Sequence, residues 1–469
     1  MATPTLDTTK TEVEKHGITR TLSEYLVGLR YEDIPAEAVD LVKLFSLECL
    51  GHMVHALAQP VGGLLVRYVR DLGAAPQATV AGAGIKTSVA EAAYVNGSLA
   101  HGEELEAYGT LPGTGLIPPI VAGFAAGEYR ERSGRDLITA VVAGIEMQGR
   151  LGMAGIGACD RGFMGISLVG PGGAGVAAGG LYGLDATQMQ HCLGTALPLS
   201  NGSLRGCGSM SHVHEAGIPA RTGVFAAQLA AGGFLSCPDF LDGEHSWGEQ
   251  FAGTGGRRPY APELLTDGLG DSLFLLKAGV APKRYGSCGL THQTIFGTIE
   301  IMREHGIGPD DIRSIELRVP PFADRVAPFR DPVNGEQAKF SIRQGVAGLL
   351  VEGIPELPYM SAFSDEASRD PRYVAARERV TIVVQDGESV RGFADQTVLV
   401  TCNDGRTIEK VVPALEQATY TRDERLAMFR NTAVPLGDSG TDQLIDTVMN
   451  LENHTVAEVM ALVAGTASP

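Results

Sequence analysis

Over its first 276 residues the chain repeats apolar side chains at helical spacing, and almost no segment alternates apolar with polar residues. Apolar residues that recur every three to four positions lie on one face of a helix. The clearest such segments are 19–30, 37–58, 87–102, 136–152 and 218–235. Asp185 precedes another apolar segment and is placed to act as a helix N-cap. We therefore predict a large helical domain over residues 1–276.

The pattern changes after residue 277. Three segments alternate or are rich in β-branched residues: IRSIELRVPP (312–321), ERVTIVVQD (378–386) and QTVLVTCNDGRTIEKVV (396–412). The last contains Asn403-Asp404-Gly405, a strong hairpin-turn signal. Helical segments lie between these strands, and the tail is helical again. We predict a mostly α fold, in which an α+β lid domain (277–415) is inserted into an all-α domain formed by 1–276 and 416–469.

Composition and charge limit the partners. The chain has 469 residues, a formal net charge of −18 and seven cysteines with no CxxC pair. This acidity argues against nucleic-acid binding but leaves a small anionic substrate possible, because a local basic pocket can form in an acidic protein. Scattered cysteines indicate a reducing compartment rather than a disulfide framework. The polar N-terminus shows no secretory signal. We predict a cytoplasmic protein with no membrane partner.

Several common site motifs are incomplete. GPGGAGVAAGG (170–180) lacks the Lys-Ser/Thr ending of a Walker loop and is not part of a βαβ unit, so tight helix packing is the favoured interpretation. His212 and His214 lie two positions apart in SHVHEAG, which is not the HExxH pattern of zinc proteases. No GxSxG motif occurs. These motifs therefore give only weak support for a cofactor loop, a metal site or a serine hydrolase.

The segment AHGEELEAYGT (100–110) gathers groups that can transfer protons. His101, Glu104, Glu106 and Tyr108 lie there, together with Glu103, between segments that look buried. A solvated helix end is the ordinary alternative for such a charge run. A carboxylate held among apolar neighbours has a raised pKa, which suits general acid–base chemistry.

A second cluster, KRYGSCGLTH (283–292), lies where the helical part meets the α+β part. It contains Lys283, Tyr285, Cys288 and His292. Junctions between domains are favoured places for small-molecule sites. The alternative is a surface loop with a solvated Lys-Arg pair.

Five motifs in order resemble those of the MmgE/PrpD family. They lie in VNGSLAHGEELEAY (95–108), RGFMGISLVGPGGAGVAAGGLYGLD (161–185), SMSHVHEAGIPARTGVFAAQLAAGGF (209–234), KRYGSCGLTHQTI (283–295) and SAFSDEASRDPR (361–372). The resemblance runs from about residue 17 to about residue 464. It implies an all-α domain with an inserted lid, a site between the two, a homodimer, and no cofactor or metal.

The resemblance carries over to some site positions and not to others. Glu104 stands where the family has an aspartate, and Tyr108 and Lys283 are matched. Family histidines are replaced by Leu111 and Met164. His212 stands at a lysine position and Gln344 at a tyrosine position. These replacements remove cations that hold small di- and tricarboxylates and add apolar surface.

The predicted function is therefore a cofactor-independent lyase or isomerase. It removes a proton next to a carboxylate or carbonyl of a small molecule that is less charged than the usual family tricarboxylates. Two alternatives stay open: a standard family activity, of the 2-methylcitrate dehydratase or cis-aconitate decarboxylase type, and a non-catalytic dimeric binding protein on the same fold. The predicted catalytic residues are Glu104, Tyr108, His212 and Lys283. The predicted substrate-binding residues are His101, Glu106, Leu111, Met164, His214, Tyr285, Cys288, His292 and Gln344.

Overall fold

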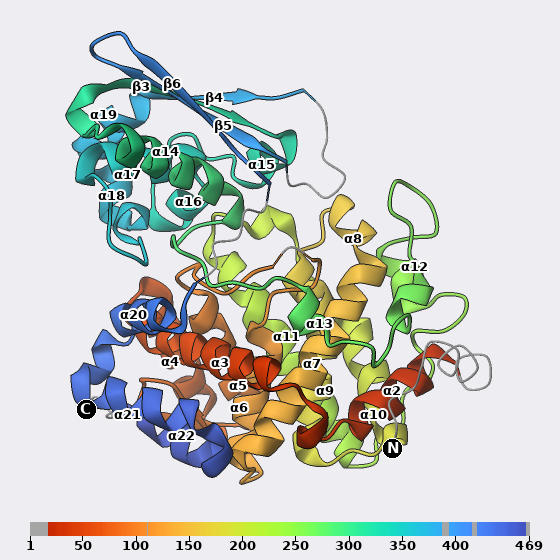
Figure 1. The fold of residues 1–469 in the computed structure, drawn as a ribbon. Helices are drawn as coiled ribbons and strands as arrows, with labels where there is room; N and C mark the ends of the chain where they lie inside the picture. Colours follow the sequence, from red (N-terminus) through yellow and green to blue (C-terminus); the bar gives the residue numbers. More distant parts are fainter. Residues whose placement is uncertain (1–16, 110, 387–393, 415–419, 466–469) are drawn as a thin grey trace.

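A computed structural model describes residues 17–109, 111–386, 394–414 and 420–465 (Figure 1). The predicted boundary between lid and tail, at 415–416, lies outside these residues, as does most of the N-terminal stretch in which no secretory signal was predicted. The fold is mostly α with one small inserted sheet domain, as the sequence predicts.

A helical body makes up most of the chain. Its helices before the lid are α2 (Ile18–Gly28), α3 (Ala36–Ala56), α4 (Pro60–Leu72), α5 (Val89–His101), α6 (Ile117–Tyr129), α7 (Gly134–Gly155), α8 (Gly157–Asp160), α9 (Gly165–Tyr182), α10 (Ala186–Ala196), α11 (His214–Ala231), α12 (Trp247–Phe251) and α13 (Phe274–Lys277). A short hairpin, β1 (Ala78–Val80) and β2 (Ile85–Thr87), lies between α4 and α5. The helices after the lid are α20 (Arg422–Thr432), α21 (Gly437–Met449) and α22 (Val456–Leu462).

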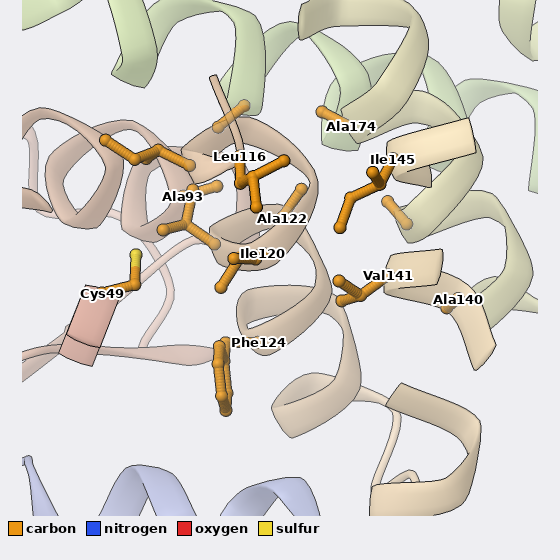
Figure 2. Close-up of a cluster of buried hydrophobic side chains, with 14 of the residues drawn as sticks. Cys49, Ala93, Leu116, Ile120, Ala122, Phe124, Ala140, Val141, Ile145 and Ala174 are labelled. Carbon is orange, nitrogen blue, oxygen red and sulfur yellow. The ribbon is translucent and has the colours of Figure 1, made fainter. Parts of the chain in front are cut away.

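The two chain ends share one hydrophobic core. Helix α9 packs between α6, α7 and α11, and α11 also packs on α5. The C-terminal helices α20 and α21 pack on α3, and α22 packs on α6. Figure 2 shows part of the resulting core, where Phe124 and Ile120 of α6 face the side chains of neighbouring helices. Residues of α20–α22 belong to the same buried cluster, so the C-terminal segment is part of the body rather than a separate unit.

Glycines let the central helices approach closely. The segment 170–180 lies within helix α9, as the packing interpretation predicts. A Cβ added at Gly223 of α11 would lie 2.4 Å from the backbone nitrogen of Gly175 in α9. A Cβ at Gly144 of α7 would lie 2.6 Å from the carbonyl oxygen of Gly173. Both helix contacts therefore require glycine.

The lid has two layers (Figure 1). A sheet of order β4-β3-β5-β6 is formed by β3 (Ile312–Val319), β4 (Val380–Val384), β5 (Gln396–Cys402) and β6 (Thr407–Val412). Strand β3 is parallel to β4 and antiparallel to β5, and the predicted turn at 403–405 joins β5 to β6. The lid helices lie between this sheet and the body: α14 (His292–His305), α15 (Pro321–Val326), α16 (Gly335–Lys339), α17 (Ile342–Glu352), α18 (Asp365–Arg369) and α19 (Pro371–Glu378).

Lid and body meet beside the end of α5. The backbones of Tyr108 and Ala281 form an antiparallel bridge, and the Lys339 ammonium of the lid donates to the carbonyl oxygen of Gly102 over 2.6 Å. Such a cation satisfies a carbonyl left unpaired at a helix C-terminus. These contacts place the AHGEELEAYGT segment at the junction.

No single helix in the described part of the chain is long and apolar enough to cross a lipid bilayer. Helices α3 and α4 pass that test only as a pair, and they bend by 89° where they meet.

Candidate active site

The turn that follows α5 separates its three glutamates. Glu103 points back into the body, where its carboxylate accepts hydrogen bonds from His55 Nδ1 (2.8 Å) and Gln59 Nε2 (2.9 Å). Glu104 has a backbone φ of 54°, in the left-handed region that non-glycine residues seldom occupy. Such a conformation persists only where surrounding contacts hold it, and it is enriched at functional sites.

Lys283 joins the other two glutamates. Its ammonium lies 2.8 Å from Glu104 Oε1 and 2.5 Å from Glu106 Oε1, and its side chain is only 3% exposed. Burial of one ammonium beside two carboxylates leaves the group of three with an excess negative charge. Glu106 Oε2 is buried and has no hydrogen-bond partner among the described residues. A buried carboxylate oxygen without a donor is costly and is ready to accept one from a ligand.

Two histidines complete the cluster. His212 Nε2 donates to Glu104 Oε2 over 3.1 Å, and its Nδ1 lies 3.9 Å from Cys207 Sγ. His101 Nδ1 donates to the carbonyl oxygen of His212 over 3.1 Å, which directs His101 Nε2 toward Glu104 Oε2 and Glu106 Oε1, each 3.7 Å away. One nitrogen of each ring is thus held by a hydrogen bond, which fixes ring orientation.

These contacts set the protonation of the carboxylates. Burial raises the pKa of Glu104, but the Lys283 ammonium and His212 outweigh it and hold that pKa well below its usual range. Burial and the Glu104 carboxylate raise the pKa of Glu106, but the opposite effect of Lys283 and His101 is larger, so that this pKa is lowered overall. The expectation of a raised carboxylate pKa was wrong, because the partners of Glu104 outweigh its apolar surroundings.

The cationic partners shift in the opposite direction. Burial lowers the pKa of His101, and the carboxylates of Glu106 and Glu104 more than compensate, so that its pKa is raised. Burial also disfavours the charged form of Lys283, and the same two carboxylates raise its pKa above the ordinary value. The cluster therefore holds paired charges and a histidine that is readily protonated.

The cluster forms one part of a cavity of about 310 Å³ at the junction of body and lid. Nine predicted site residues line this cavity: His101, Glu104, Glu106, Tyr108, Leu111, Met164, His212, Lys283 and Cys288. Most of the remaining wall is apolar or glycine. The volume lies at the lower end of the range for small-molecule sites.

Four predicted substrate-binding residues lie outside this lining. His214 bonds to the hydroxyl of Tyr94 over 2.7 Å, and Gln344 bonds to Ala362 and Arg377 within the lid. The ring of His292 contacts Tyr285 edge-on and bonds to the carbonyl oxygens of Tyr285 and Ser287. Burial lowers the pKa of His292 to about 3, so its ring is neutral. These four side chains therefore form contacts away from the cavity lining.

One triad has metal-ligand spacing. Ligand atoms of His101, Glu104 and His212 all lie within 4.8 Å of one another. The Lys283 ammonium, bonded to Glu104, would repel a divalent cation at that position. The donor set therefore fits a proton-transfer cluster better than a metal centre.

The structure adds site residues that the sequence patterns did not indicate. Cys159, Cys207 and Arg258 line the cavity, as do Phe322, Val326 and Phe340 of the lid. None lies in a motif with a recognisable spacing. Only Phe322, Val326 and Phe340 could have been proposed as lining residues from the sequence, because they lie next to predicted elements of the lid.

Comparison with known proteins gives consistent matches along the chain. The MmgE/PrpD N-terminal domain model matches residues 20–258, and the MmgE/PrpD C-terminal domain model matches residues 285–452. The cis-aconitate decarboxylase-like protein oryM of Aspergillus oryzae is 26% identical over 482 aligned positions, which cover 96% of this chain and 97% of the relative. The human cis-aconitate decarboxylase is 26% identical over 349 positions, which cover 72% of this chain and 71% of the relative.

Proposed function

Since this chain belongs to the MmgE/PrpD family, we propose that it is a cofactor-independent lyase or isomerase that removes a proton next to a carboxylate or carbonyl. The family points to dehydratase or decarboxylase activity. The single observation that supports proton abstraction is the buried cluster of Glu104, Glu106, Lys283, His101 and His212 in a cavity with mostly apolar walls.

Lys283 and Glu104 act as a coupled pair in this proposal. Without substrate the ammonium stabilises the Glu104 carboxylate and makes it a weak base. When a substrate oxygen binds the Lys283 ammonium, that ammonium stabilises the Glu104 carboxylate less. The pKa of Glu104 then rises, and Glu104 becomes a stronger base beside the substrate carbon. Glu104 then takes the proton, and the electron pair left on carbon moves onto the oxygen beside Lys283, whose charge stabilises the enolate.

The next step depends on the substrate. A β-hydroxyl can leave as water after taking a proton from protonated His101, which leaves a carbon–carbon double bond. Delivery of a proton by a second site acid to the opposite face of the carbon inverts that centre, while Glu104 keeps the proton that it took until that proton exchanges with solvent. In decarboxylation a carboxylate leaves as carbon dioxide, with no prior loss of the C–H proton, and the carbanion takes a proton from a site acid. Tyr108 lines the cavity and is placed to donate a hydrogen bond to a substrate oxygen.

The apolar wall supports a substrate with fewer charges than a tricarboxylate. Leu111 and Met164 line the cavity at positions where the family resemblance implies histidines. Each would bury apolar surface of a ligand rather than pair with a carboxylate, at roughly 25 cal/mol per Å² removed from water.

The alternative is cis-aconitate decarboxylation, the activity after which the relatives are named. The specific observation in its favour is the alignment with oryM along almost the whole of both chains. It requires the cavity to hold three substrate carboxylates, although Leu111 and Met164 on its wall offer no charge.

Incubation in D2O with a panel of acids, followed by proton NMR, separates these functions. The panel contains cis-aconitate, a 2-methylcitrate and singly or doubly charged hydroxy and oxo acids with longer apolar chains. The proposal predicts deuterium incorporation or product from the less charged acids and little from the tricarboxylates. Conversion of cis-aconitate alone would establish the alternative. Thermal stabilisation by an acid that never exchanges or reacts would instead indicate a binding protein.

The double variant Leu111→His, Met164→His sharpens the distinction. Restoring two protonatable side chains should shift preference toward tricarboxylates if these positions select the substrate. An unchanged preference would show that the apolar wall does not control specificity. Leu290→Met is a matched control, because it changes another apolar wall residue without adding charge.

A further inference from the structure

The cavity has a second charged centre, Arg258. This residue lies in the loop after α12 and lines the cavity, as does Cys159 of α8. Its guanidinium forms a two-pronged ion pair with Asp160: Nε donates to Oδ2 over 2.7 Å, and Nη2 donates to Oδ1. The Arg258 side chain is 17% exposed. A carboxylate that holds two of the three guanidinium nitrogens fixes the plane of the group.

The backbone around Arg258 is also fixed. A Cβ at Gly157 would lie 1.9 Å from the carbonyl oxygen of Arg258, so the loop rests directly on the start of α8. Two backbone bonds anchor the following residues, from Tyr260 to Gly253 (2.9 Å) and from Ala261 to Ala154 (3.0 Å). Arg258 therefore lines the cavity from a segment whose backbone is held in place.

A charge comparison distinguishes Arg258 from Lys283. Lys283 shares its charge with two carboxylates that line the same cavity. The partner of Arg258 is Asp160, which is not part of the lining. The remaining nitrogen, Nη1, has no hydrogen-bond partner among the described residues, so it can donate to a ligand. Apolar residues, including Ile156, Ile166 and Val326, make up much of the lining besides the two centres.

From this arrangement we propose that Arg258 is a specificity-determining residue that binds a distal carboxylate of the substrate. The reacting end lies at Lys283 and Glu104, an apolar chain crosses the cavity, and the distal carboxylate accepts hydrogen bonds from Arg258. This inference rests on the proposed function for the identity of the reacting end. It defines the substrate class as an elongated diacid with an apolar middle.

Calorimetry with paired 2-oxo acids tests the assignment. The first pair is 2-oxoadipate and 2-oxohexanoate, which differ only in the distal carboxylate, and a series of longer and shorter 2-oxo diacids finds the preferred chain length. The wild-type protein should bind the preferred diacid about tenfold more tightly than its one-carboxylate counterpart, as expected for one charge-assisted hydrogen bond. Arg258→Gln should abolish this preference, and Arg258→Lys should keep part of it. Arg205→Gln is the control, because Arg205 is an exposed arginine next to the cavity-lining Leu204.

Exchange of the C3 protons of the same acids in D2O is measured in parallel. Arg258→Gln should raise KM for the diacid and leave the exchange rate at saturation within about twofold. Equal wild-type affinity for both members of every pair, or a preference that Arg258→Gln retains, would overturn the inference even if exchange continues. A preference that depends on Arg258 in a protein that never exchanges C3 protons would instead overturn the proposed function and leave the anion site in place.

Discussion

At the residue scale, Lys283 compensates two buried carboxylates at once. Its ammonium bonds to Oε1 of Glu104 and of Glu106, and His212 bonds to the other oxygen of Glu104. Removal of one partner from a buried ion pair leaves an uncompensated charge, which costs more than the pair itself contributes. Lys283 should therefore matter for stability, and in the proposed function its charge also stabilises the developing enolate.

Lys283→Met should lower the free energy of unfolding by about 3–5 kcal/mol and lower turnover at least tenfold. Denaturant titration and the D2O assay measure the two effects. Lys410→Met is the matched control, since Lys410 pairs with the exposed Glu304 at the surface and should change stability by about 0–1 kcal/mol. Equally small decreases in the free energy of unfolding in both variants would show that the buried ion pairs of Lys283 contribute no more to stability than a surface pair.

The neutral, buried His292 predicts a pH dependence of stability. Its pKa is about 3 in the folded protein and about 6.5 when unfolded. Between pH 6.5 and 3 the unfolded chain binds a proton at His292 and the folded chain does not. The free energy of unfolding therefore keeps its full value above pH 6.5 and falls as the pH drops toward 3. The slope from this one residue reaches about 1.4 kcal/mol per pH unit.

His292→Gln removes the titrating ring and keeps a hydrogen-bond donor. Chemical denaturation between pH 6.5 and 4.5 should show a shallower loss of stability in this variant than in the wild type. His305→Gln, at an exposed position, provides the comparison. Parallel pH profiles for wild type and His292→Gln would contradict a neutral His292 in the fold.

Sequence patterns indicated the segment that lines the cavity but not its electrostatics. AHGEELEAYGT was predicted as a site because several proton-transferring groups lie within it, and Glu104, Glu106 and His101 do converge on one cavity. The pKa of Glu104 moved opposite to expectation because Lys283 and His212 lie 179 and 108 positions away in the chain. Arg258 carries no local signal, because its role depends on how its loop lies on α8.

At the element scale, most helices and the β5–β6 hairpin were predictable from periodicity and turn chemistry. Asp185 caps α10 as predicted, with its side chain bonded to the backbone of Gln188. The β1–β2 hairpin was not predicted, because strands of three residues are too short to show alternation. Helix α6 was not predicted either, since its first turn contains Pro118 and Pro119, and proline is tolerated in a helix mainly in that turn.

The crossing of α9 and α11 predicts opposite effects for two glycines. Gly223→Ala should destabilise the protein by about 1–3 kcal/mol, because its Cβ would lie 2.4 Å from backbone of α9. Gly180 also lies in α9, but a Cβ added there would meet only Ala140 of α7, with 3.5 Å between the two Cβ atoms. Gly180→Ala should therefore be neutral or stabilising by up to about 1 kcal/mol. Thermal unfolding of both variants measures this. A neutral Gly223→Ala would show that the helices can separate without cost.

At the scale of the whole molecule, the body and the lid each have a hydrophobic core, and the cavity lies where they meet. Cys207 of the body packs into the lid core, and Lys339 of the lid bonds to the end of α5. The position of the lid is therefore linked to the segment that carries Glu104.

The family resemblance implies a homodimer, and the surface offers an apolar strip for one. Leu64, Tyr68 and Leu72 of α4 lie at helical spacing and are 42–49% exposed. We predict a dimer by size-exclusion chromatography with light scattering, and a shift toward monomer in Leu64→Asp, Leu72→Asp. Leu235→Asp, at an exposed leucine of another segment, should leave the mass unchanged. A monomeric wild type would contradict the prediction.

The most direct test of the account is C–H exchange in D2O with Glu104→Gln. The glutamine keeps the shape of the side chain, and its carbonyl oxygen can still accept the hydrogen bond of Lys283. Its NH2 group cannot accept from His212, and the side chain cannot take the substrate proton. For whichever acid the wild type exchanges, Glu104→Gln should lower the exchange rate at least tenfold and retain binding of the acid. Glu37→Gln, on the exposed first turn of α3, should exchange at the wild-type rate. Full exchange in a folded Glu104→Gln protein would contradict the central claim that the cluster at Glu104 removes the substrate proton.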